Sequence, residues 1–168
     1  MIRPAAQELA DHLDESIAVQ ERLLELVQRQ RPAIVSGHHD RVDALAGEIE
    51  IEVRRLAAAE QARAMAAEAL ADELGLAATR WSALREALSA DERSLVGPLV
   101  ARVESVVRDL ELANAVNGQL VRQELDLLDL SVKSLASPDP RTANRAYTAA
   151  GGRASAPPAG PMLLNTAA

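Results

Sequence analysis

Apolar residues recur every three or four positions through three long stretches of the chain, residues 4–34, 40–75 and 89–136. This spacing aligns side chains along one face of an α-helix. Residues 76–88 show the same pattern over a shorter length. The pattern therefore predicts three long amphipathic helices and one short helix.

Residues typical of helix ends lie between these stretches. Gly37 and Gly75 follow the first two helices and are expected to end them. Residues that favour helix N-termini precede the other helices: Asp40, Thr79, and Ser89 with Glu92 in the S-x-x-E pattern of a capping box. In the short helix, Trp81 is expected to close one end of the core.

The composition supports an all-α protein. The 168 residues are 48% hydrophobic, but Phe is absent and there is one Trp and one Tyr, so side chains that favour strands are few. We expect an elongated antiparallel helical bundle or coiled coil of three long helices plus one short helix, spanning residues 1–136. Residues 137–168 are rich in Pro, Ala and Gly and are predicted to form a flexible tail.

The net charge of −7 makes nucleic acid and anionic membranes improbable partners. The positive tail leaves the helical part still more acidic. There is no cysteine, no apolar signal core near Met1, and no apolar run long enough to span a membrane. These features predict a cytoplasmic protein.

Candidate chemistry is sparse. His12, His38 and His39 lack a convincing set of neighbouring metal ligands, and no phosphate-binding loop or nucleophile motif is present. The chain is therefore expected to be no enzyme and to hold no metal or cofactor. An enzyme or metal protein that uses these histidines is the least favoured alternative.

The last long helix is predicted to bind a partner. Its apolar stripe changes phase where Ala113, Asn117, Val121 and Leu125 follow one another at intervals of four. The half before Asn117 is expected to face the core and the half after it a partner. The predicted binding residues are Asn114, Asn117, Val121, Leu125, Leu128, Val132 and Leu135.

Two alternatives remain open for this surface. One of the asparagines could instead bond within the bundle or face water. In the tail, Tyr147, Leu163 and Leu164 are predicted to contact a partner; the alternative is that Tyr147 packs on the bundle and the two leucines are idle.

Several motifs resemble the FlgN family of flagellar type III export chaperones. They are Leu23-Leu24-Glu25-Leu26, the turn from Ser36 to Asp40 followed by Leu45, the set Leu56, Glu60, Arg63 and Leu70 to Gly75, and Leu110, Asn114, Asn117 and Leu120 with the later Tyr147 and Gly151-Gly152. Two positions depart from the family pattern. Glu48, Glu50 and Glu52 stand where many members carry a lysine, and Thr148-Ala149-Ala150 separates Tyr147 from the glycines.

The resemblance implies a cytosolic chaperone that binds the C-terminal helical segments of the hook–filament junction proteins FlgK and FlgL. It would prevent their premature self-association and deliver them to the cytoplasmic domain of the export gate. A structural coiled-coil protein that pairs with itself, with a weak homodimer as the mildest form, is the alternative.

Overall fold

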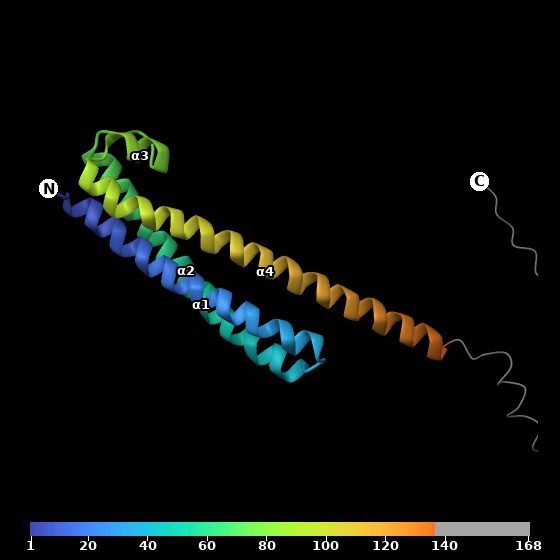
Figure 1. The fold of residues 1–168 in the computed structure, drawn as a ribbon. Coiled ribbons are helices and arrows are strands. Elements are labelled where there is room, and N and C mark those ends of the chain that lie inside the picture. The colour runs from blue at the N-terminus through green and yellow to red at the C-terminus, as the bar shows by residue number, and fades with distance from the viewer. Residues whose placement is uncertain (137–168) are drawn as a thin grey trace, which may run out of the picture. The chain divides into compact units, whose positions relative to one another are not determined.

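The computed structural model describes residues 1–136, with side chains to residue 133. The described chain is built from helices alone, which confirms the predicted all-α fold (Figure 1). The helices are α1 (Pro4–Val35), α2 (His39–Glu73), α3 (Trp81–Ala87) and α4 (Ala90–Ala136). The chain divides into two units, Met1–Leu125 and Asp126–Ala168, and the predicted tail lies outside the described residues.

Helices α1 and α2 form a hairpin whose turn depends on Gly37. Its φ of 66° is a left-handed conformation that other residues rarely adopt. The Gly37 amide donates to the carbonyl of Ile34 at 3.0 Å, and the His38 amide donates to that of Ala33 at 3.0 Å. Gly75, also at φ 66°, follows α2 in the same way. Both predicted helix-ending glycines are confirmed.

Two predicted N-caps are wrong. Helix α2 begins at His39, so its N-cap is His38. Asp40 lies within the first turn, where its negative charge interacts favourably with the positive end of the helix dipole. Helix α3 begins at Trp81 after the N-cap Arg80, which leaves Thr79 one residue too early. Neither N-cap makes a side-chain capping hydrogen bond.

Small side chains let α1 and α2 approach closely. Buried alanines of both helices contribute to one hydrophobic cluster: Ala5, Ala6 and Ala10 from α1, with Ala66, Ala67 and Ala71 from α2. Three further residues complete this cluster near the N-terminal end of α1: Leu84 of α3, Leu88, which follows α3, and Val96 of α4. Trp81 is partly buried against it, so part of its indole reaches the surface.

Within the first unit, α4 runs in the same direction as α1 (Figure 1). Contacts along the two helices fix this register. Arg3 bonds Glu92, the Nε of Arg102 donates to Glu21 at 2.9 Å, and Asn117 bonds the carbonyl of Val27. The hairpin of α1 and α2 and the first part of α4 therefore form one three-helix bundle.

The start of α4 holds a buried carboxylate. Glu92 is 1% exposed and forms the predicted capping box, accepting from the Ser89 amide at 2.9 Å and the Ser89 hydroxyl at 2.8 Å. It also accepts from the Arg3 amide at 3.0 Å and the Arg3 guanidinium at 2.8 Å. Burial by itself raises the pKa of Glu92, but these hydrogen bonds and the Arg3 charge outweigh it and lower the pKa to about 2.

Replacing this carboxylate should destabilise the bundle. We expect Glu92→Gln to lower the free energy of unfolding by about 3 kcal/mol, because Arg3 and Ser89 lose a charged acceptor inside the protein. Urea unfolding followed by circular dichroism measures the change. The neighbouring Asp91→Asn removes an exposed ion pair with the N-terminus and should cost less than about 1 kcal/mol. Equal effects of the two substitutions would contradict the role given to Glu92.

The same carboxylate should make stability depend on acid pH. Because the pKa of Glu92 lies near 4.5 when unfolded and about 2 when folded, its contribution is present above about pH 4.5 and is lost as the pH falls toward 2. The difference in unfolding free energy between the wild type and Glu92→Gln should therefore shrink between these values. Urea titrations of both proteins at pH 7, 4 and 3 measure it, and a difference that stays constant would refute the prediction.

Candidate functional site

The burial of α4 changes along its length within the first unit. Val96, Val106 and Ala113 are buried, whereas Val121 and Leu125 are exposed. The change falls at Asn117, where the apolar stripe changes phase. The first part of α4 thus contributes to the core, and its later part presents large apolar side chains to solvent.

Two physical causes account for this change. Steps of four residues rotate the apolar stripe by about 40° each around an α-helix, so the stripe turns away from its earlier neighbours. In addition, the 90-residue offset between Val27 and Asn117 places the last residue of α1, Val35, level with Leu125. Helix α1 therefore ends level with Leu125, one helical turn after the first exposed valine, Val121.

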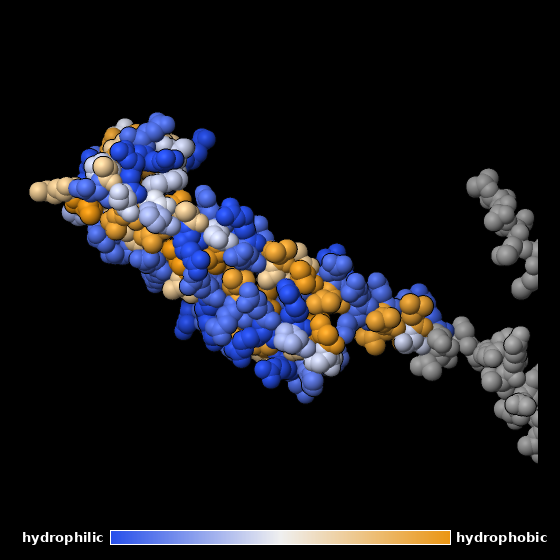
Figure 2. All heavy atoms as spheres, in the orientation of Figure 1, coloured by the Kyte–Doolittle hydropathy of each residue, from blue (hydrophilic) through white to orange (hydrophobic). Residues whose placement is uncertain are grey.

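Residues 126–136 of α4 belong to the second unit, and their described side chains are all exposed, half of them large and apolar. The leucines and valine concerned are Leu127, Leu128, Leu130 and Val132. Hydrophobic residues reach the surface of this part of α4 in Figure 2. Lys133 and Asp129 form an ion pair at 2.6 Å one helical turn apart. The side chain of Leu135, and all of Tyr147, Leu163 and Leu164, lie outside the described residues.

The structure separates the two predicted asparagines. Asn117 is 5% exposed and its Nδ2 donates to the carbonyl of Val27 at 2.8 Å. Its buried Oδ1 has no hydrogen-bond partner among the described residues. Asn114 is exposed. Asn117 is therefore part of the contact between α1 and α4, as in the alternative in which one asparagine bonds within the bundle, and Asn114 alone is free to meet a partner.

The histidines do not come together in the described part of the chain. His12 lies on α1 with its Nδ1 3.4 Å from Glu15, and His38 contacts the Ser36 hydroxyl at the far end of the hairpin. Residues 1–133 contain no group of three or more His, Asp or Glu side chains placed to hold a metal ion. None of the helices described for residues 1–136 has a stretch long and apolar enough to cross a membrane.

Two features of the site region were not predicted from sequence. The first is the bond between Glu92 and Arg3, which are far apart in the chain. The capping-box pattern predicted the contact of Glu92 with Ser89, but no sequence signal marked its contact with Arg3. The second is the groove beside Trp81, which Arg85 and Arg93 line. The four-residue spacing of Trp81 and Arg85 on one short helix was the available signal for that groove.

A comparison with known families decides the affiliation. The model of the FlgN family, described as FlgN protein, matches residues 1–155. The chain belongs to the FlgN family. This membership implies a general role as a flagellar export chaperone, and the family is one of chaperones rather than enzymes. No significant match was found to a curated protein or to a solved structure.

The two asparagines of this FlgN-family chain should differ in their effect on stability. Asn117→Ala should lower the free energy of unfolding by about 1–2 kcal/mol, because it removes a buried hydrogen bond and leaves a small cavity. Asn114→Ala should be neutral or slightly stabilising, since Ala is the better helix former and Asn114 is exposed. Urea unfolding midpoints measure both. A larger loss for Asn114→Ala would contradict the assignment of Asn117 to the bundle.

Proposed function

We propose that this protein is a cytosolic export chaperone for the hook–filament junction proteins FlgK and FlgL. It binds their C-terminal helical segments, keeps them from associating too early, and delivers them to the cytoplasmic domain of the flagellar type III export gate. The supporting observation is the row of large apolar side chains that α4 leaves exposed after Asn117. Family membership supports the general role, and the row of exposed residues suggests where cargo binds.

An amphipathic cargo helix fits such a row. Val121, Leu125, Leu128 and Val132 recur at intervals of four, three and four, which is the spacing of one face of a helix. A cargo helix with the same spacing can lay its apolar face along them. Asn114, one to two turns earlier, is exposed and offers an amide that can bond a polar cargo group.

The strength of such a complex can be bounded. The four side chains are 41–62% exposed, so covering them contributes about 1 kcal/mol each. Together they contribute about 4 kcal/mol, which matches only the lowest estimates of the free energy that two molecules lose in translational and rotational freedom on association. Contacts with the flanking Leu127 and Leu130 would add to it. Binding therefore depends on these flanking contacts and on the apolar face of the cargo as well as on the row itself.

The remaining predicted contacts extend the same proposal. Leu135 continues the row by one further step of three residues. Tyr147, Leu163 and Leu164 supply the aromatic and apolar groups of the C-terminal residues and are proposed to contact cargo or the export gate.

Substitution within the row tests the cargo surface. Leu125→Asp with Leu128→Asp should reduce capture of the FlgK C-terminal segment at least tenfold, because carboxylates placed in an apolar contact stay unpaired. Co-purification of the segment with the purified chaperone measures capture. Circular dichroism should show unchanged helix content, since both side chains are exposed.

The matched control is Ile51→Asp with Met65→Asp on α2. These side chains are 53% and 63% exposed, close to the values for the tested pair, but they belong to a different helix from the row. The control should bind cargo as the wild type does. Unchanged capture by the Leu125 and Leu128 variant would refute the surface, and a tight dimer in light scattering that ignores FlgK and FlgL would favour the self-associating coiled coil.

A further inference from the structure

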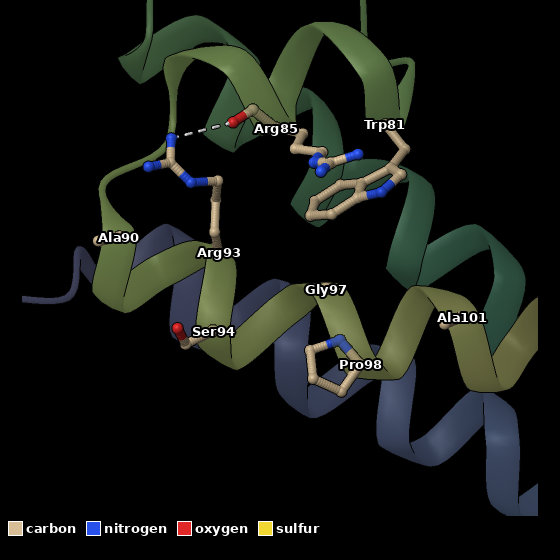
Figure 3. Close-up of a pocket in the computed structure, with 8 residues that line it drawn as sticks. All are labelled: Trp81, Arg85, Ala90, Arg93, Ser94, Gly97, Pro98 and Ala101. Atoms are coloured by element: carbon tan, nitrogen blue, oxygen red, sulfur yellow. Dashed lines mark hydrogen bonds between the residues drawn. The ribbon is translucent and has the colours of Figure 1, made fainter.

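A groove of about 610 Å³ lies between α3 and the first turns of α4 (Figure 3). It belongs to the first unit and is separate in sequence from the row of exposed residues on α4. Its walls come from both helices: Trp81, Arg85, Ala90, Arg93, Ser94, Gly97, Pro98 and Ala101. Figure 3 shows the indole of Trp81 and the guanidinium of Arg85 side by side over the groove.

The groove is cationic although the chain is acidic. Its lining contains two arginines and no carboxylate, whereas the whole chain has a net charge of −7. An adjoining hollow is lined by Ser82, Glu86 and the same two arginines, so one carboxylate lies near the arginines but outside the groove's own lining. Within the described residues, Arg85 forms no ion pair. A positive groove on a negative protein selects for anionic partners.

Arg93 is held in place by the backbone. Its Nη1 donates to the carbonyl of Leu88 at 2.6 Å and lies 3.4 Å from the carbonyl of Arg85. Both acceptors are neutral carbonyls near the end of α3, so the positive charge of Arg93 is not cancelled. The remaining N–H groups of its guanidinium can bind a carboxylate.

The other side of the groove is apolar. Trp81 faces Gly97, where an added Cβ would lie 3.7 Å from the indole Cζ2. The indole edge therefore lies close to the backbone of α4 at Gly97, with room for no more than a methyl group between them. Together with Pro98 and Ala101, the indole provides a flat surface for one apolar side chain.

We propose that this groove binds a short acidic segment of a partner protein, with an apolar side chain against Trp81 and carboxylates on Arg85 and Arg93. Charge argues against the chain's own C-terminal residues as the occupant, since residues 137–168 contain three arginines and one aspartate. Two arginines on a protein of net charge −7 are also too few to hold a nucleic acid backbone.

Trp81 makes the proposal directly measurable because it is the sole tryptophan of the protein. Random twelve-residue peptides displayed on phage are selected on the full chain, and selected peptides without tryptophan are synthesised. We expect Asp or Glu together with Leu or an aromatic residue to be enriched. Each such peptide should shift or quench the Trp81 emission saturably, and its affinity should fall as salt is raised.

Two variants with a matched control locate the binding. Arg85→Glu alone should weaken peptide binding at least tenfold without loss of helix, because the side chain of Arg85 makes no hydrogen bond or ion pair within the described residues. Arg85→Glu with Arg93→Glu should abolish it. The control Arg54→Glu with Arg55→Glu on α2 changes the net charge by the same amount as the double variant and should bind as the wild type does.

Three results would overturn the proposal. They are the recovery of no peptides or of peptides without acidic residues, binding unaffected by Arg85→Glu, and a concentration-dependent change of Trp81 emission that light scattering traces to a second copy of the chain. The Arg85→Glu variant should still capture FlgK normally. A loss of peptide binding in this variant therefore tests the groove alone, and a loss of FlgK capture in the Leu125 and Leu128 variant tests the cargo surface alone.

Discussion

The bundle depends on one buried carboxylate, that of Glu92. It accepts hydrogen bonds from Ser89, which immediately precedes α4, and from Arg3, which immediately precedes α1. A buried charge without partners would cost several kcal/mol, so the two segments must meet for either arrangement to be stable. This requirement places the starts of α1 and α4 side by side, and the contacts of Arg102 with Glu21 and of Asn117 with Val27 then hold the two helices in the same direction. The positions of the later residues of α4 within the first unit follow from that origin.

A set of polar contacts continues this control farther along the bundle. The fully buried Ser16 hydroxyl donates to Glu60 of α2, which also accepts from Arg63. Burial alone raises the pKa of Glu60, but these two partners outweigh it and lower the pKa. Asn117 then fixes α4 against Val27. A core made mostly of Ala and Leu packs almost equally well in several registers, and such paired polar groups favour one of them.

The fold thus sets up two surfaces of different chemistry. Within the first unit, α4 presents Val121 and Leu125 to solvent near the end of α1. At the opposite end of the first unit, α3 folds back beside α4 and forms a groove with two arginines and Trp81. One surface is apolar and the other cationic, so the two are suited to different partners.

Local sequence determined much of this protein. Periodicity gave the helices to within a few residues at most ends, since burial of one face every 3.6 residues leaves a strong signal. Gly37 and Gly75 marked two helix ends because only glycine readily adopts their positive φ. The change of phase at Asn117 marked where α4 leaves the core. Asp40 and Thr79 were misplaced as caps because helix starts depend on competing backbone bonds. Only the tertiary structure decided that Arg3 meets Glu92, that Asn117 rather than Asn114 is buried, and that Arg85 and Arg93 share a groove. These contacts join residues of different helices, and their partners are fixed by packing, which no local pattern records.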